Sequence, residues 1–154
     1  MQDLIASSLK YQNNTLSVLD QYLLPHQQVW HECDDVASMR DLILSLKIRG
    51  APLIGLGASL LVAHLAEQGT AKVALAQAID DLEATRPTAV NLMHCMAKLR
   101  IALQQDDYVT AIVSAAVTLF NEDIALCESM ANHGAALVSS GDNILTHCNT
   151  GALA

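Results

Sequence analysis

The spacing of apolar positions predicts strands at the beginning of the chain. Apolar and polar residues alternate through Leu9–Tyr11 and Thr15–Leu19, which is the period of half-buried strands. Between them lie Asn13 and Asn14, which suit a turn whose residues have positive φ. A third strand is expected at Gln28–His31. The first part of the chain should therefore form a small antiparallel sheet.

From Asp34 onward the apolar residues recur every three or four positions, which is the period of helices packed on one side. The connections between these periodic stretches are short, as in a bundle of mostly antiparallel helices. Five helices are expected: a first begun by Asp34, a second over 51–67 begun by Ala51-Pro52, a third over 71–84 begun by Thr70, a fourth over 87–103 begun by Pro87, and a fifth over 108–138 begun by Asp106-Asp107.

The last stretch of the chain combines a strand pattern with a thiol. Asn143–His147 includes the apolar pair Ile144 and Leu145 and predicts a short buried strand, after which Cys148 leads into a helix start at Asn149–Gly151. The dipole and unpaired N–H groups of a helix N-terminus stabilise a thiolate. Cys148 is therefore a candidate reactive residue, and a small buried side chain is the alternative.

Together these elements predict an α+β fold with three parts. We expect a small antiparallel sheet in residues 1–32, a helical bundle in 33–141, and the start of a further α/β unit in 142–154. A strand that leads into a helix begins an α/β unit, but no second strand pattern follows in this sequence. We therefore expect the chain to be the front portion of a longer protein.

Composition narrows the classes of partner and compartment. The formal net charge of -8 argues against a general nucleic-acid binder, which needs a basic face. No uninterrupted apolar run reaches the roughly 18 residues of a spanning helix, so no membrane partner is expected. The four cysteines form no C-x-x-C pair, no zinc pattern is present, and no secretory signal is visible. These features favour reduced thiols in a cytoplasmic protein without a metal site.

Two arginines stand just before expected helix starts. The segments Arg49-Gly-Ala-Pro52 and Arg86-Pro-Thr88 each place a guanidinium beside a proline, which is favoured in the first helical turn. The unpaired N–H groups, the positive end of the helix dipole and the guanidinium together favour an anion, most naturally phosphate. Gly50 would also allow close approach of the backbone. The alternative is that each arginine pairs with a carboxylate or caps a neighbouring helix.

Three separated motifs resemble the methylthioribose-1-phosphate isomerase family. They are Ile48–Gly55, Arg86–Leu92 and Thr146–Ala154, in the family's order, and the Leu9–Leu19 hairpin also matches. The superfamily also contains ribose-1,5-bisphosphate isomerase and regulatory subunits of the translation initiation factor that exchanges guanine nucleotide. The intact motifs, cysteine included, favour the methylthioribose enzyme over those relatives.

The resemblance implies an aldose–ketose isomerase of methionine salvage, a route of methionine biosynthesis. Such an enzyme converts 5-methylthioribose 1-phosphate to 5-methylthioribulose 1-phosphate without a metal or an organic cofactor, and usually forms a homodimer as the full-length protein. By the motif match, Arg49, Gly50, Ala51 and Arg86 contact the substrate phosphate, and Cys148 is the catalytic cysteine. The family's N-terminal domain is followed by a larger Rossmann-like domain.

One departure from the family limits this expectation. The family's catalytic aspartate lies beyond position 154, and hydrogen transfer between C1 and C2 needs both an acid and a base. We therefore expect this chain alone to be an inactive fragment. The competing hypothesis is a regulatory module of the initiation-factor branch, which works by protein contact and would tolerate loss of the thiol and both arginines. Ribose-1,5-bisphosphate isomerase is a further alternative within the superfamily.

Overall fold

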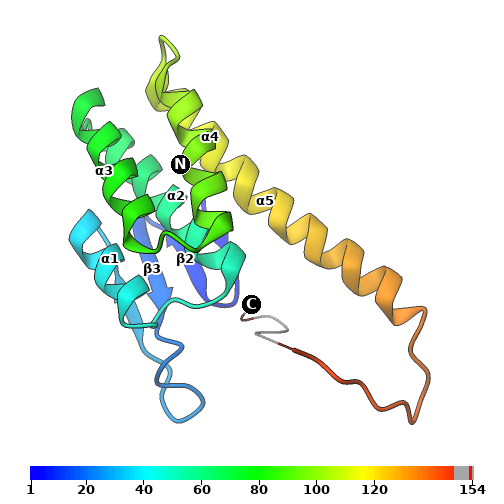
Figure 1. Ribbon diagram of the computed structural model, residues 1–154. Coiled ribbons are helices and arrows are strands. Elements are labelled where there is room, and N and C mark those ends of the chain that lie inside the picture. The colour runs from blue at the N-terminus through cyan, green and yellow to red at the C-terminus, as the bar shows by residue number, and fades with distance from the viewer. Residues whose placement is uncertain (148–152, 154) are drawn as a thin grey trace.

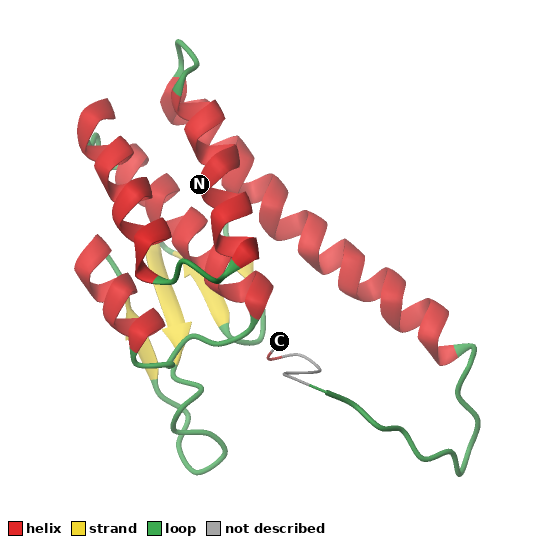
Figure 2. Cartoon of the chain, viewed as in Figure 1, coloured by secondary structure: helices red, strands yellow, loops and turns green. Residues whose placement is uncertain are grey.

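The computed structural model describes residues 1–147 and residue 153. They have the predicted α+β fold, an antiparallel sheet followed by helices (Figures 1 and 2). The strands, in the sheet order β1-β2-β3-β4, are β1 (Leu4–Ile5), β2 (Leu9–Gln12), β3 (Thr15–Leu19) and β4 (Trp30–Glu32). The helices are α1 (Val36–Leu44), α2 (Ala51–Glu67), α3 (Lys72–Thr85), α4 (Val90–Leu103) and α5 (Tyr108–Ala135).

The β2–β3 hairpin forms where the alternating pattern predicted it. Gln12 pairs with Thr15, and the two asparagines between them, Asn13 and Asn14, have φ of 51° and 62°. Positive φ at both central residues gives the hairpin turn whose twist matches that of the strands. Strand β1 was not predicted, because two residues are too few to show an alternating pattern.

Helix α2 lies between the sheet and the other helices (Figure 1). Every residue from 53 to 64 is buried, and side chains on all sides of the helix join the same core as the inward-facing residues of β2 and β3. Leu60 and Leu61, for example, have no exposed surface. Burying the whole circumference explains why this helix is apolar throughout rather than along one stripe.

Two predicted helix starts are wrong in detail. Asp35, not Asp34, caps α1, because its Oδ1 accepts a hydrogen bond from the backbone N–H of Ser38 at 2.7 Å. Thr70 does not cap α3, which begins without a side-chain cap. The backbone N–H of Thr70 instead donates to the carbonyl of Leu65, so that Thr70 belongs to the turn that ends α2.

Helix α5 is the longest element, and it is buried only in its first half. Asp107 caps it by accepting from the N–H of Thr110, and its buried residues lie between Ile112 and Phe120. By length and composition alone α5 would suffice to cross a membrane, although acidic residues such as Glu122 and Asp123 interrupt its apolar run. Its first half packs against α2 and α4 instead.

The strand predicted at 143–147 does not form. Residues 142–147 have no regular secondary structure, and the side chains of Ile144 and Leu145 are 70% and 100% exposed. A strand needs a neighbouring strand to pair its backbone groups, and none of the four strands of the described sheet lies beside this segment.

Candidate functional site

The start of α2 carries the first predicted anion site. Gly50 is the N-cap with φ of 99°, a conformation that glycine adopts without steric cost, and Ala51 and Pro52 open the helix as predicted. No side chain caps this end of α2. Within the described residues, the backbone N–H groups of Gly50 and Ala51 have no hydrogen-bond acceptor. Both are therefore placed to bind an anion at the positive end of the helix dipole.

The second predicted site is arranged differently from the expectation. Arg86 ends α3, Pro87 and Thr88 form a turn, and α4 begins only at Val90. The N–H of Ala89 donates to the carbonyl of Arg86 at 2.9 Å, which closes the turn with proline at its second position. The expectation that Pro87 opens the helix is wrong, because residues 86–89 form this hydrogen-bonded turn and Ala89 is the N-cap of α4.

The two helix starts lie against each other. A Cβ atom built on Gly55, in the first turns of α2, would be 3.0 Å from the carbonyl oxygen of Asn91 and 2.8 Å from the Sγ of Cys95, both in the first turns of α4. Only a residue without a side chain permits this approach. A cavity of about 320 Å³ lies at the junction, between Pro52 of α2 and Val90 of α4. The fold therefore brings together two motifs that are far apart in the sequence.

Both candidate arginines are free of internal ion pairs in the described part of the chain. Arg49 and Arg86 are exposed, and neither contacts a described carboxylate. By contrast, Arg100 pairs with Asp80 and Glu83 on α3. The described residues thus give no support to the alternative in which each candidate arginine has a carboxylate partner.

The candidate catalytic thiol, Cys148, lies outside the described residues. Of the others, Cys33 and Cys95 are buried and Cys127 is exposed. Burial raises the pKa of Cys33 to about 12 and also raises the pKa of Cys95, so both are neutral, weakly nucleophilic thiols at pH 7. Among the described residues, no three His, Cys, Asp or Glu side chains gather as a metal site would require.

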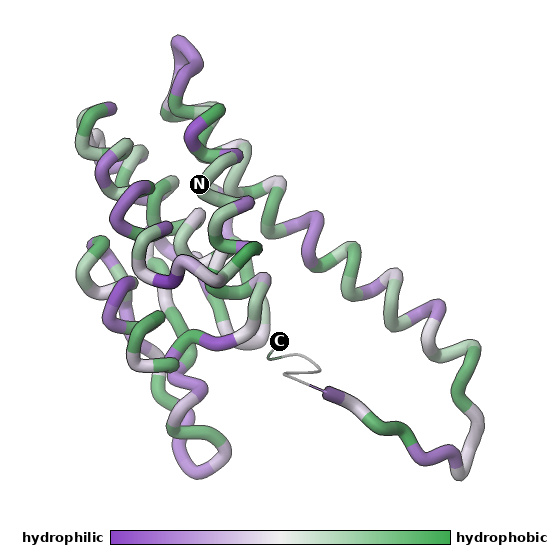
Figure 3. The backbone as a smooth tube through the Cα atoms, in the orientation of Figure 1, coloured by the Kyte–Doolittle hydropathy of each residue, from purple (hydrophilic) through white to green (hydrophobic). Residues whose placement is uncertain are grey.

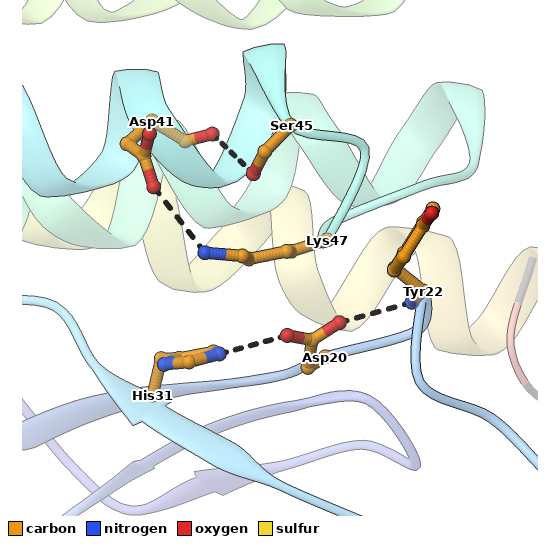
Figure 4. Close-up of polar contacts among 6 residues, drawn as sticks. All are labelled: Asp20, Tyr22, His31, Asp41, Ser45 and Lys47. Carbon is orange, nitrogen blue, oxygen red and sulfur yellow. Dashed lines mark hydrogen bonds and ion pairs between the residues drawn. The ribbon is translucent and has the colours of Figure 1, made fainter. Parts of the chain in front are cut away.

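A buried polar cluster that was not predicted lies beneath the loop before α2. Asp20, only 2% exposed, accepts from the backbone N–H of Tyr22 at 3.0 Å, and its other oxygen lies 2.9 Å from Nε2 of His31 (Figure 4). Gln21, 7% exposed, hydrogen-bonds to the loop itself through Lys47 and Arg49. The only sequence signal was the polar pair Asp20-Gln21 directly after a strand.

An apolar groove of about 740 Å³ lies beside the first turns of α2. Its walls come from the β1–β2 loop, the first turns of α2 and the part of α5 from Phe120 onward, and include Leu53 and Ile124. Asp123 lies in both this groove and the smaller cavity, and burial raises the pKa of its carboxyl group. Neither cavity is lined by the four candidate phosphate-binding residues, Arg49, Gly50, Ala51 and Arg86.

Comparison with known sequences places this arrangement in a family. Residues 47–154 match the profile of the Initiation factor 2 subunit family. The chain is 53% identical, over 152 residues, to a methylthioribose-1-phosphate isomerase of Yersinia pestis (strain Pestoides F), covering 99% of this chain and 44% of that relative. It is 51% identical to the enzyme of the same name from Serratia proteamaculans (strain 568), over 100% of this chain and 45% of the relative. The chain therefore spans less than half the length of these relatives.

Solved structures show the same fold. The 5-methylthioribose 1-phosphate isomerase of Pyrococcus horikoshii OT3 superimposes with a TM-score of 0.86 and 30% identity, over 97% of this chain and 45% of that one. The translation initiation factor eIF-2B, subunit delta, from A. fulgidus gives a TM-score of 0.72 and 29% identity, over 97% of this chain and 46% of that one.

Proposed function

Because the chain belongs to the Initiation factor 2 subunit family, we propose that it is the N-terminal part of a methylthioribose-1-phosphate isomerase, an aldose–ketose isomerase of methionine salvage. The observation that supports this most is the 53% identity to a protein of that name over 99% of the chain. The packing of the first turns of α2 against those of α4 also supports it, because it brings the segments that follow the two arginines close together.

In this proposal the substrate phosphate lies at the start of α2. The N–H groups of Gly50 and Ala51 donate to it, and the guanidinium groups of Arg49 and Arg86 neutralise its charge. Holding the phosphate there fixes C1 and C2 of the sugar relative to the reacting groups, which is how positioning lowers the barrier of such a reaction.

Cys148 supplies one half of the acid–base chemistry in the same proposal. Moving hydrogen between C1 and C2 of 5-methylthioribose 1-phosphate needs a group that removes a proton and one that delivers a proton. The second group would be an aspartate from sequence that follows position 154. The relatives are more than twice as long as this chain and so have room for it. The chain alone is then inactive, and the complete enzyme is a cytoplasmic homodimer without metal or organic cofactor.

An isomerase assay on 5-methylthioribose 1-phosphate tests this function. We expect turnover by a protein extended through the length of the relatives and none by the 154-residue chain. In the extended protein, Cys148→Ser should lower kcat by about 10²–10⁴-fold, and Arg49→Ala should mainly raise KM. Cys127→Ser and Arg40→Ala alter an exposed thiol and an exposed arginine elsewhere, and should leave both parameters unchanged.

The alternative is a regulatory module of the initiation-factor branch. The similarity to the A. fulgidus eIF-2B delta subunit favours it, since the fold is shared across almost the whole chain. An extended protein without isomerase activity, whose partner binding survives Cys148→Ser and Arg49→Ala together, would establish this alternative and refute the enzyme.

A further inference from the structure

The loop that carries Arg49 and Gly50 needs an external support. It connects α1 to α2 over residues 45–50 and contains two backbone positions in the left-handed region, Leu46 with φ of 59° and Gly50 with φ of 99°. Glycine has several accessible conformations, so the peptide between Arg49 and Gly50 has more than one stable orientation in the absence of other contacts. The orientation of this peptide decides where the N–H of Gly50 points.

Gln21 provides this support from the end of β3. Its backbone N–H donates to the carbonyl oxygen of Lys47 at 2.9 Å, and its side-chain Nε2 donates to the carbonyl oxygen of Arg49 at 3.3 Å. The Gln21 residue is only 7% exposed, so water competes little for these bonds. One residue thus contacts the loop at two carbonyls that lie on either side of the buried Ile48.

The geometry of the peptide bond transmits this contact to the ligand side. In a planar trans peptide the C=O of one residue and the N–H of the next point in opposite directions. When Gln21 fixes the carbonyl of Arg49 towards the protein interior, the N–H of Gly50 must point the other way. This N–H has no acceptor among the described residues, which agrees with an outward direction. A flipped peptide would present a carbonyl oxygen instead and would repel an anion.

Gln21 is itself held in place from below. The neighbouring Asp20 donates its backbone N–H to the carbonyl of Val29 at 2.8 Å, and its buried carboxylate contacts Tyr22 and His31 (Figure 4). Hydrogen bonds of the neighbouring residues therefore hold the backbone on both sides of Gln21. This fixes the position of the Gln21 Cα atom, from which the side chain extends. A firmly anchored residue that bonds to a glycine-containing loop has the arrangement expected of a positioning group.

We propose that Gln21 is a positioning residue for phosphate binding: its amide holds the Arg49 carbonyl so that the N–H of Gly50 faces the ligand. The inference rests on the proposed function, because it assigns the phosphate to the start of α2. The role differs from packing, since it requires a hydrogen-bond donor at the end of the side chain and not merely a side chain of this size.

Titration of the 154-residue chain with inorganic phosphate, followed by NMR of backbone amides, tests the proposal. Gln21→Met keeps the length of the side chain and removes the donor, and we expect the Kd for phosphate to rise about three- to tenfold. The three-bond coupling between the amide and α protons of Gly50, which reports φ, should change in the same variant. Gln21→Glu should weaken binding further, because a carboxylate repels both the Arg49 carbonyl and the anion.

Tyr11→Phe is the matched control. It also removes the hydrogen-bonding group of a buried side chain, but its partners are distant from Gly50 in the chain. The Tyr11 hydroxyl donates to Asn14 in the β2–β3 turn and contacts His64 and Glu67, which lie at the opposite end of α2 from Gly50. This variant should lose stability while keeping the parent Kd and the parent Gly50 coupling.

Two failures of the test are distinguishable. If phosphate causes no shifts near Arg49 and Gly50 in the parent chain, the proposed anion site is wrong. If the Gly50 coupling is the same in Gln21→Met as in the parent, the inference is overturned whether or not the parent binds. Equal Kd values for the parent and Gln21→Met would likewise overturn the inference alone.

Discussion

Helices α2 and α5 are both rich in apolar residues but have opposite surroundings. In α2 every residue from 53 to 64 is buried, whereas α5 buries only Ile112, Ala116, Leu119 and Phe120, all in its first half. Figure 3 shows that apolar residues nevertheless continue, mixed with polar ones, along the second half of α5.

Composition and neighbours both contribute to this difference. The second half of α5 carries the acidic residues Glu122, Asp123 and Glu128, whereas α2 has only Glu67 at its end. In addition, α2 is surrounded by the sheet and four helices, while the second half of α5 extends past them (Figure 1). An apolar helix sequence indicates that burial of the helix is favourable. Whether the helix is buried depends on the elements that pack against it.

The second half of α5 shows what remains uncovered. Ile124, Leu126 and Met130 are 37%, 57% and 58% exposed, and this part of the helix forms one wall of the apolar groove. Soluble monomers rarely expose contiguous apolar surface of this kind. The contrast between α2 and α5 can therefore be tested with pairs of identical substitutions, one in each helix.

Leucine-to-alanine substitutions should give the largest difference. Leu60→Ala in α2 removes a side chain with no exposed surface, and should lower the free energy of unfolding by about 2–5 kcal/mol through lost burial and a cavity. Leu126→Ala in α5, where the side chain is 57% exposed, should cost about 0.5 kcal/mol or less. Urea denaturation measures both. Equal losses would mean that the second half of α5 is covered in solution.

Glycine-to-alanine substitutions should give a smaller difference of opposite sign. Gly55→Ala in α2 forces a Cβ against the Asn91 backbone and should destabilise the fold by about 1–3 kcal/mol. Gly134→Ala near the end of α5 meets nothing within 4 Å, and should stabilise the helix by about 0.5–1 kcal/mol because alanine has the higher helix propensity. Thermal unfolding of the two variants checks the signs, and destabilisation by Gly134→Ala would contradict the open surroundings of α5.

The N-terminal caps of the two helices should give the smallest difference in stability, and this difference should depend on pH. Asp107 caps α5, and hydrogen bonds from Thr110 hold its pKa below the usual value, whereas α2 has no side-chain cap. A depressed pKa stabilises the fold above the unfolded value of 3.8, and this contribution disappears as pH falls through the folded value. Asp107→Ala should therefore lower Tm slightly at pH 7, and this difference should shrink as the pH falls below 3.8 towards pH 2. A Tm difference that persists at pH 2 would show that the cap does not act through its charge.

The sequence predicted the elements whose signals are local. The Asn13-Asn14 turn and the Ala51-Pro52 start of α2 each depend on the conformational preferences of two adjacent residues, and both formed as predicted. The start of α4 was predicted three residues early, because the turn preference of Arg86-Pro87 competes with the helix-start preference of proline.

What the sequence could not show depends on contacts between distant residues. The hydrogen bond from Gln21 to Arg49 joins positions 28 residues apart, and no spacing rule indicates it. The predicted strand at 143–147 is the converse case: Ile144 and Leu145 have the right pattern, but a strand also needs a partner that the described residues do not provide. For the candidate site, the motifs predicted the residues, and the fold showed that the starts of α2 and α4 pack together at Gly55 and Asn91.

The close approach of Gly55 to the backbone of Asn91 prevents α2 and α4 from moving closer together. A backbone carbonyl oxygen cannot move aside as the flexible end of a side chain can. The distance between the two helix starts is therefore fixed by this packing. For protein engineering, the adjustable parts are the exposed side chains of the loops at 45–50 and 86–89, while Ile48 and the two carbonyls bonded to Gln21 should be kept. A library that varies those loops would change the reach and charge of the binding groups while the interval between the helices stays constant.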